Sequence, residues 1–380
     1  MLDVSRRAIY GEDHHALRES ARRLIEQHAT PHLQRWEDDG IVDRSFYEVC
    51  GEAGFLGPSV PKEYGGMGLD FSYNAVLAEE FAYAGVNICV LLQSELVLPY
   101  LIDFGTEEQK RKFAVPLANG TKIGAIAMTE PGAGSDLQSV RTTARRDGDS
   151  FVINGSKTFI TNGQNADIMI VVARTSQDRG GKGLSLIIVE GGTPGFTRGR
   201  NLDKIGQWSG DTSELFFEDV RVPAENLLGP ENGGFGCLMR ELVRERLGIA
   251  VGAQAAAQRA FDVGLSYTKE RSAFGRPVFD FQNTRFSLAG LATELQVGWA
   301  HLDWAIQRYL AGGLAPTEAS SAKYWHTEMQ WRVVDTALQL HGGHGYMNEF
   351  EVARLWRDAR VQRIYGGTSE IMLEVIGRGL

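Results

Sequence analysis

One carboxylate lies where the sequence predicts the apolar face of a helix. In the segment CLMRELVRERLGIAVG, residues 237–252, spacings of 4, 3, 4 and 3 place five positions on one face: Leu238, Leu242, Glu245, Ile249 and Gly252. Isolated burial of a carboxylate is costly, so Glu245 must be paired, protonated or functional. An ion pair with Arg244 or Arg246 would be a structural role, whereas a general base would be a catalytic one. Glu241, on a neighbouring line of the same helix, is the competing candidate base.

Three further segments could bring the backbone or a side chain close to a ligand. AMTEPGAGSD, residues 127–136, combines the hydroxyls of Thr129 and Ser135 with two glycines that permit close backbone approach. RIYGGTSEIM, residues 363–372, contains a Gly-Gly-Thr turn, and YTKERSAFGRPVFDFQ, residues 267–282, combines cations with aromatic rings. Each segment also fits an ordinary loop or helix end, so none of them identifies a ligand by itself.

Several other kinds of site are disfavoured. GAGSDL has Leu137 where a dinucleotide-binding motif needs its third glycine, and the chain has no Walker A sequence. His341 and His344 are separated by two glycines, without a cysteine or carboxylate cluster nearby, so a metal site is not expected. The three cysteines include no CxxC pair, which argues against a disulfide framework and for a reducing compartment.

Charge and hydropathy exclude two classes of partner. The formal net charge is −9, which argues against a broad nucleic-acid footprint. No apolar run approaches the ~18 residues that a membrane span requires, so membrane insertion is not expected. The first residues lack the apolar core of a signal peptide and are too acidic for a typical transit peptide, so a cytoplasmic location is expected.

Residue composition and hydrophobic periodicity change twice along the chain, which predicts an α+β protein of three domains. Residues 1–122 are expected to be helical, with Thr106 as an N-cap. Residues 123–232 are rich in β-branched residues and are expected to form an antiparallel β domain, with tight turns at Asn154-Gly155 and Asn162-Gly163. Residues 233–380 contain four long periodic segments, which predict a helix bundle: 237–271, 282–311, 317–341 and 348–379.

Together these segments resemble the acyl-CoA dehydrogenase family over nearly the whole chain. The blocks that carry the resemblance are, in order, MTEPGAGSD, ITNG, LFFEDVRVP, ERSAFGRPV and QLHGGHGYMNEFEVARLWRDARVQRIYGGTSEIM. The resemblance implies a helical N-terminal domain, a β-barrel-like middle domain and a C-terminal four-helix bundle. It also implies FAD as cofactor, an acyl-CoA substrate, electron-transfer flavoprotein as electron acceptor and, usually, a homotetramer.

The resemblance carries individual site residues onto this sequence. Residues that match the flavin-contacting segments are Ile126, Met128, Thr129, Ser135, Phe159, Ile160 and Thr161. Residues that resemble contacts to the FAD of a neighbouring subunit are Arg271, Phe274, Phe281 and Gln282, with Gln339, Gly342 and Gly343 along the pyrophosphate and Thr368 and Glu370 on the adenosine side. Residues implied to bind substrate are Ser135, Leu242, Arg246, Gly366 and Gly367.

The base departs from the short- and medium-chain pattern. Those relatives carry it as Glu in YEGT, where this chain has Gly366, and a glycine cannot take a proton. The long-chain and isovaleryl-CoA branches place Glu on the bundle helix, and ELVRERLGIA resembles that arrangement with Glu245 as the base. The implied reaction is α,β-dehydrogenation to a trans-2-enoyl-CoA in fatty-acid or branched-acyl catabolism, with hydride transfer to flavin N5 and the Gly366 N–H stabilising the thioester oxygen.

The sequence leaves open two alternative functions, the length of the acyl chain and the roles of two polar residues. A same-fold flavin oxidase or monooxygenase would use O₂, and a non-catalytic acyl-CoA-binding subunit would lack turnover. Acyl chain length depends on pocket depth, which residue spacing does not measure. Gln93 and Glu95 either line the acyl pocket or belong to a helix surface.

Overall fold

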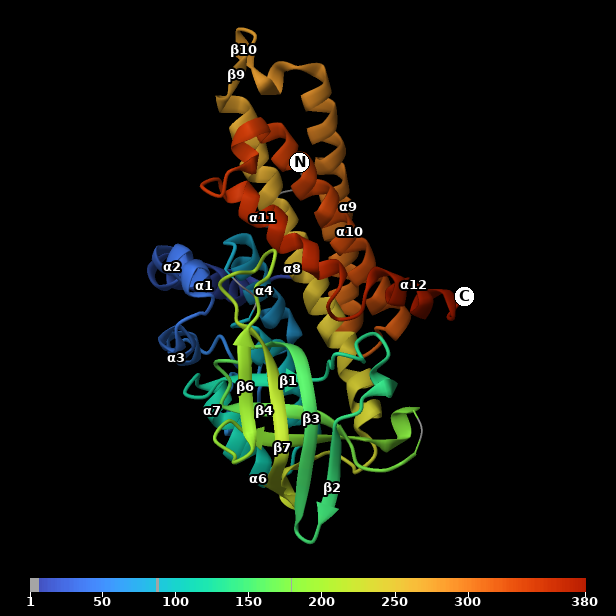
Figure 1. Cartoon of the computed structure of the whole chain (residues 1–380). Helices are drawn as coiled ribbons and strands as arrows, with labels where there is room; N and C mark the ends of the chain where they lie inside the picture. Colours follow the sequence, from blue (N-terminus) through green and yellow to red (C-terminus); the bar gives the residue numbers. More distant parts are fainter. Residues whose placement is uncertain (1–6, 87–88, 179) are drawn as a thin grey trace.

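The computed structural model describes residues 7–86, 89–178 and 180–380. Figure 1 shows N-terminal helices beside a twisted sheet, with long helices extending beyond it. The N-terminal helices are α1 (Glu12–His28), α2 (Leu33–Asp39), α3 (Arg44–Glu52), α4 (Phe71–Tyr83), α5 (Leu98–Phe104), α6 (Glu107–Gln109) and α7 (Val115–Ala118). The order helix, sheet, helix confirms the α+β fold expected from the sequence.

Capping and proline residues explain the local form of the helices before the sheet. The Thr106 hydroxyl accepts from Gln109 N at 3.2 Å, and Gln109 Oε1 accepts from Thr106 N at 3.0 Å. This capping box confirms Thr106 as the N-cap of α6. Wide π turns, Gln93–Val97 and Lys110–Ala114, lead into α5 and α7. Each is followed by a proline near the start of the next helix, whose missing N–H interrupts the regular hydrogen-bond ladder.

The sheet is mixed rather than wholly antiparallel. Its strands are β1 (Gly124–Ala127), β2 (Thr143–Asp147), β3 (Ser150–Thr161), β4 (Ile168–Arg174), β5 (Leu184–Glu190), β6 (Phe196–Asn201), β7 (Thr212–Pro223) and β8 (Leu227–Leu228). The order is β6-β7-β3-β2-β4-β5-β8, and β1 pairs with β4. Both β1 and β2 pair with β4 in parallel. The antiparallel expectation was therefore wrong for these two pairs, because long connections return the chain to the β4 position in the same direction.

The two Asn-Gly pairs do not form hairpin turns. Asn154-Gly155 lies inside β3, at a register shift against β7, where Gly155 has a φ of +145°. The tight turn between β2 and β3 instead contains Gly148 at a φ of +61°. Asn162-Gly163 does turn the chain at the end of β3, but β4 then pairs elsewhere in the sheet. Asn-Gly therefore indicated unusual backbone conformations without specifying which strands pair.

The C-terminal third forms long helices, but the last predicted segment is broken. The helices are α8 (Gly234–Glu270), α9 (Gln282–Leu310), α10 (Pro316–His341), α11 (Glu351–Ala359) and α12 (Ser369–Gly377), with a short ribbon of β9 (Ser272–Ala273) and β10 (Arg276–Pro277) after α8. The segment 348–379 was expected to be one helix. It is interrupted by the 3₁₀ turn Arg360–Arg363 and by Gly366 and Gly367, whose φ values are +64° and +101°. Positive φ at two successive glycines is incompatible with a continuous α-helix.

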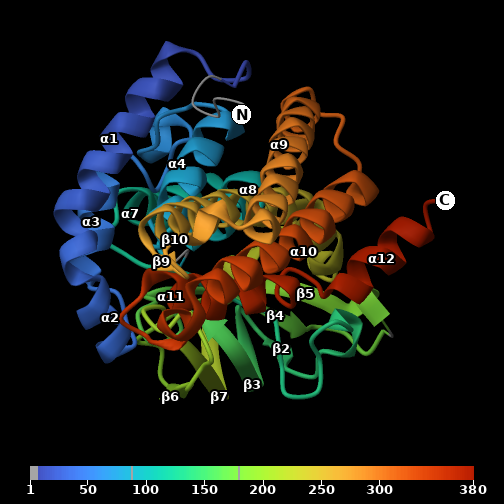
Figure 2. The ribbon, with the colours of Figure 1, turned by 90° about the horizontal axis from the view of Figure 1, so that it is seen from above.

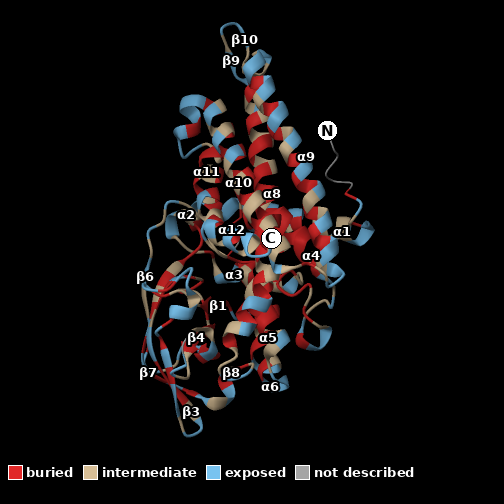
Figure 3. Cartoon of the chain, turned by 90° about the vertical axis from the view of Figure 1, so that its right-hand side faces the viewer, coloured by how far each residue is buried: buried red, intermediate tan, exposed pale blue. Residues whose placement is uncertain are grey.

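The helix α8 connects the parts of the fold. It packs against α4 on one side and α9 and α10 on the other, and seen from above it lies between α4 and α10 (Figure 2). Figure 3 shows that buried positions continue along α8 where these neighbours cover it. Because α8 carries Glu245, the packing of α4 and α10 determines what surrounds that carboxylate.

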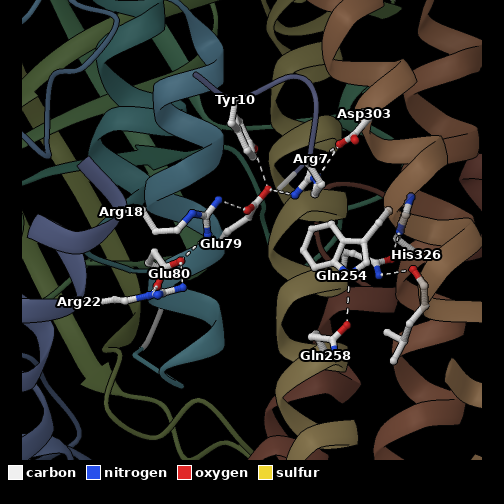
Figure 4. Close-up of polar contacts among 12 residues, drawn as sticks. Arg7, Tyr10, Arg18, Arg22, Glu79, Glu80, Gln254, Gln258, Asp303 and His326 are labelled. Atoms are coloured by element: carbon white, nitrogen blue, oxygen red, sulfur yellow. Dashed lines mark hydrogen bonds and ion pairs between the residues drawn. The ribbon is translucent and has the colours of Figure 1, made fainter. Parts of the chain in front are cut away.

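A buried polar network fastens the N-terminal segment to this packing (Figure 4). Glu79 of α4 accepts from Arg7 Nη1 at 2.5 Å, from Tyr10 OH at 2.7 Å and from Arg18 Nη2 at 2.7 Å. Arg7 Nε also donates to Asp303 of α9 at 2.6 Å. The buried charges are thus paired across three elements, which fixes α1 and α4 relative to the bundle.

Candidate active site

Glu245 lies on the buried face of α8 beside the Gly366-Gly367 turn. Its Oε1 is 3.4 Å from the position that a Cβ atom would take on Gly366. Its Oε2 is buried and has no hydrogen-bond partner among the described residues. Burial raises the pKa of Glu245 to about 7, although the positive charges of Arg246 and Lys323 act to lower it. A carboxyl with this pKa can accept a proton near neutral pH.

Two cations hold the glycine turn through its backbone carbonyls. Arg246 Nε donates to Gly366 O at 3.4 Å, and its Nη1 donates to Ser320 Oγ at 3.1 Å. Lys323 Nζ donates to Gly367 O at 2.6 Å. A Cβ atom on Gly366 would lie 2.4 Å from Ile249 Cδ1, so a side chain there would require the end of the Ile249 side chain to move. Glycine accommodates the positive φ of the turn and leaves room for Ile249.

Glu241, the competing candidate, has a different environment on the same helix. Burial and the nearby carboxylate of Asp103 raise the pKa of Glu241 to about 7 as well, so the pKa does not choose between the two. The contacts separate them, because Glu241 Oε1 is 3.9 Å from Arg240 Nε on the side of α8 that faces Asp103. Only Glu245 adjoins the glycine turn. The geometry therefore favours Glu245 as the base.

The structure brings together two of the segments that resemble flavin contacts. Thr158 N donates to Thr129 O at 2.9 Å, which joins the end of β3 to the loop after β1. Phe159 has a φ of +58° and leaves 67% of its surface exposed. Met128, Thr129 and Thr161 are half-buried and Ser135 is exposed. The side chains of Ile126 and Ile160 instead point into the cores beneath the sheet, so either residue could meet a ligand mainly through its backbone.

Comparison with known proteins decides the family. Models of the acyl-CoA dehydrogenase N-terminal, middle and C-terminal domains match residues 11–121, 125–220 and 232–380. The chain belongs to the acyl-CoA dehydrogenase family.

Individual relatives support the long-chain branch within that family. The long-chain specific acyl-CoA dehydrogenase of Sus scrofa is 46% identical over 381 aligned residues, which cover 100% of this chain and 89% of the relative. An acyl-CoA dehydrogenase from Geobacillus kaustophilus is 48% identical with a TM-score of 0.96, covering 97% of this chain and 98% of that one. A glutaryl-CoA dehydrogenase from Mycobacterium smegmatis in complex with FADH2 is 29% identical with a TM-score of 0.92, covering 98% and 95%.

The remaining residues carried over from the acyl-CoA dehydrogenase resemblance lie away from Glu245. Arg271, Phe274 and Gln282 are exposed at the far end of α8 and the start of α9, where Phe274 and Phe281 make an edge-to-face contact. Exposed Gln339, Gly342 and Gly343 lie at the same end, where Tyr267 stacks on His341. Thr368 and Glu370 are separate from both groups, at the start of α12, which Thr368 caps. One chain therefore does not bring the whole predicted FAD set together.

Two fully buried lysines were missed by the sequence interpretation. Lys157 of β3 donates to Met128 O at 3.0 Å and to Glu130 Oε1 at 2.9 Å, which ties the loop after β1 to the sheet. Lys323 of α10 donates to Gly367 O at 2.6 Å and so supports the Gly366-Gly367 turn. Lysine usually indicates a solvated surface, and both partners include backbone carbonyls that carry no sequence signature. No motif in this sequence could have identified these contacts.

Gln93 and Glu95 have separate roles in the acyl-CoA dehydrogenase fold. Gln93 is fully buried, donates to Lys122 O at 3.0 Å and accepts from Gly124 N at 3.0 Å, so it joins the π turn before α5 to the start of β1 and does not belong to a helix surface. Glu95 accepts from Asn74 Nδ2 at 2.7 Å, and its Oε2 is 3.5 Å from a Cβ position on Gly248. Glu95 therefore faces α8 a single turn beyond the candidate base.

A small cavity of about 60 Å³ lies further along the same face of α8. Gly252 and Ala256 of α8 line it, together with Phe81 and other residues of α4. Three of its polar lining residues are Gln207, Gln330 and Asp358. Within the described residues, no helix is both long and apolar enough to cross a membrane.

Proposed function

We propose that the protein oxidises the Cα–Cβ bond of an acyl-CoA thioester to a trans-2-enoyl-CoA, with Glu245 as the base that takes the α-proton. The observation that carries the proposal is the contact between Glu245 and the Gly366-Gly367 turn. In the resemblance to the short- and medium-chain enzymes, the base belongs at position 366. Here Glu245 Oε1 lies 3.4 Å from the position that a Cβ atom would take at 366, so carboxylates at the two positions would adjoin the same region of the site.

The residues near the sheet fit a flavin. Phe159 exposes an aromatic ring from a positive-φ backbone, and the preceding residue, Thr158, is hydrogen-bonded to Thr129 O. A Cβ atom on Gly132, Gly342 or Gly343 would meet nothing within 4 Å, which leaves backbone accessible to a large ligand. The groups that would hold FAD are the loop residues 126–135, the strand end 159–161 and, from a second subunit, the distal residues of α8, α9 and α10. When bound, FAD supplies the acceptor for the hydride that leaves Cβ.

The side chains around Glu245 support its role as base. Leu242 and Ile249 flank it on the same face of α8 and exclude water, which keeps the pKa of the carboxyl near 7. The α-proton then moves from the substrate to a carboxylate oxygen of Glu245. The Gly366 N–H is the proposed donor to the thioester oxygen as negative charge develops there, and Arg246 holds the turn in place through Gly366 O.

The resemblance of ELVRERLGIA and YGGTSEIM to the long-chain branch supports a medium-to-long or methyl-branched acyl group, as does the 46% identity to a long-chain specific relative. Each additional buried methylene would contribute about 0.8 kcal/mol until the pocket ends. The proposal also includes three properties of the enzyme. It acts in fatty-acid or branched-acyl catabolism, passes its electrons to electron-transfer flavoprotein and assembles as a homotetramer.

Two substitutions on one helix test the assignment of the base. Glu245→Gln should retain bound flavin and acyl-CoA binding while turnover falls by roughly three orders of magnitude or more, because the proton acceptor is lost. Glu241→Gln is the matched control and should retain most of its activity. Rates would be measured with C4 to C16 and branched acyl-CoA substrates and an artificial electron acceptor.

The results also separate the alternative functions. Full turnover in Glu245→Gln, with loss in Glu241→Gln, would transfer the role of base to Glu241. Rapid O₂ consumption by the reduced, product-bound enzyme would indicate an oxidase. Purified protein without flavin colour would indicate a non-catalytic acyl-CoA-binding subunit. A sharp rate optimum at C4 would contradict the proposed substrate class.

A further inference from the structure

Lys323 is a charged residue buried completely in the middle of a bundle helix. Its exposed surface is 0%, and burial lowers its pKa to about 8. Burying an ammonium group is costly unless its donors are used. Its Nζ donates to Gly367 O at 2.6 Å. This hydrogen bond, to the glycine turn that adjoins Glu245, thus offsets the cost of burying the ammonium group.

The α10 helix supplies two residues to this side of the site. Ser320 lies a single turn before Lys323, accepts from Arg246 Nη1 at 3.1 Å and donates to Pro316 O at 2.7 Å. Arg246 in turn reaches Gly366 O. Two consecutive carbonyls of the turn are therefore held by two cations, one from α8 and one from α10. Because two glycines in the left-handed region have no side chains to fix them, these carbonyl contacts determine where the turn lies.

The same lysine also influences the charge of Glu245. Arg246 and Lys323 are the two cations that act against burial to lower the pKa of Glu245. The other titratable groups that sense the Glu245 charge are Tyr100 and Tyr365, whose pKa values burial raises first and Glu245 raises further. Glu328 and Glu370 act on Lys323 from its other side. Removing Lys323 would remove a positive charge near the base without changing the base itself.

We propose that Lys323 is a positioning residue, which holds the Gly366-Gly367 turn against α10 in register with Glu245 and balances the charge of that carboxylate. The inference rests on the proposed role of Glu245 as base. Lys323 touches the backbone of the turn and does not itself transfer a proton.

Three substitutions at position 323 separate the hydrogen bond from the charge. Lys323→Met removes both, Lys323→Gln retains an N–H donor without the charge, and Lys323→Arg retains both in a larger group. In Lys323→Met the acidic limb of the kcat/KM profile should move to higher pH, since a lost cation disfavours the carboxylate form. On that limb, below pH 7, kcat/KM should fall roughly tenfold for a change of one pKa unit. The Met variant should lose kcat more than it raises KM, because the base and the turn act mainly in the transition state.

The intermediate variants and a control make the result specific. Lys323→Gln should show the same displaced pH limb with a smaller loss of kcat at high pH, and Lys323→Arg should return the limb toward that of the wild type. Lys204→Met is the control, because Lys204 is another largely buried lysine whose Nζ bonds a backbone carbonyl, that of Gly210, away from Glu245. It should lower thermal stability without moving the pH limb.

The outcomes distinguish this inference from the proposed function. A wild-type pH profile in Lys323→Gln and Lys323→Met, with reduced melting temperature alone, would overturn the positioning role. If Lys323→Met does not fold, the Gln and Arg variants still decide the matter, because they differ mainly in charge. Glu245→Gln is measured in the same assay. Turnover in that variant would refute the proposed base whatever the result at position 323.

Discussion

Glu245 is a carboxyl group buried on an apolar helix face, and the cost of ionising it there should be measurable as a change in the free energy of unfolding. Burial raises its pKa from 4.5 to about 7, so the folded state binds the proton more tightly than the unfolded state does. The contribution of Glu245 to stability is therefore largest below pH 4.5 and is lost as the pH rises through 7. Relative to wild type, Glu245→Gln should be more stable at pH 8 by roughly 1–3 kcal/mol, and by much less at pH 5.

Urea unfolding of both proteins at the two pH values measures this difference. Glu241 has a similarly raised pKa but is present in both proteins, so its contribution cancels. If Glu245→Gln is equally or less stable than the wild type at pH 8, favourable interactions in the folded state must offset the cost of burying the charged carboxylate.

At this scale the sequence indicated the candidate base but not the residues that surround it. Glu245 could be found because periodicity shows that a carboxylate interrupts an apolar face. Lys157 and Lys323 could not be found, because their surroundings are created by segments far apart in the chain. Their partners are backbone carbonyls, at Met128 and Gly367, that every residue type possesses. Tyr100 was missed for the same reason: its hydroxyl is buried and has no partner among the residues that the structure describes, and it senses the charge of Glu245.

At the scale of elements, the ends of β1 and β3 are joined by one buried ion pair. Lys157 donates to Met128 O and Glu130, while Glu130 also accepts from Arg141 N at 2.7 Å and Thr142 N at 2.9 Å. Burial acts to raise the pKa of Glu130, but Lys157 and these N–H donors hold it below its ordinary value. Lys157→Met should destabilise the protein by about 3–5 kcal/mol, because it leaves a buried carboxylate without its counter-charge. Weaker flavin retention should accompany this loss.

A double variant shows whether the pair is the cause. Lys157→Met combined with Glu130→Gln removes both charges and should recover part of the stability that Lys157→Met loses. Thermal unfolding and flavin fluorescence of the single and double variants give the comparison. A loss below about 1 kcal/mol in Lys157→Met would mean that water or rearranged loop groups replace the lysine.

The elements themselves were predictable to different degrees. Helices α8, α9 and α10 could be read from their periodicity, because long amphipathic segments give a strong local signal. The Gly366-Gly367-Thr368 turn was indicated by its composition, but the periodicity of 348–379 extended across it and so did not show that the helix is interrupted there. The parallel pairing of β1 with β4 was missed because pairing direction depends on long connections that strand composition does not specify.

At the scale of the whole molecule, the order of helical and β segments was predictable from the sequence. The residues predicted to contact FAD, however, do not come together within a single chain. Figure 1 places the β9–β10 tip at the opposite end of the bundle from the sheet. Phe274, at this tip, has 96% of its surface exposed. Residues that resemble FAD contacts thus occupy both ends of the molecule, and a second copy of the chain would have to supply those at the tip. The resemblance assigned the residues at the tip to the FAD of a neighbouring subunit, and their distance from the sheet in one chain is consistent with that assignment.

FAD binding should accordingly depend on association of subunits. The residues at the exposed tip resemble contacts to the FAD of a neighbouring subunit, which is the reason to expect this dependence. Arg271→Ala should weaken flavin retention because it removes a cation from the part of the site that a neighbour supplies, while leaving the fold of each subunit intact. Arg145→Ala, at an exposed arginine of β2, is the control and should retain flavin. Sedimentation velocity with detection at the flavin absorbance measures association and occupancy together. A stable monomer that carries a full complement of FAD would refute the dependence, since the distal residues would then be unnecessary for binding.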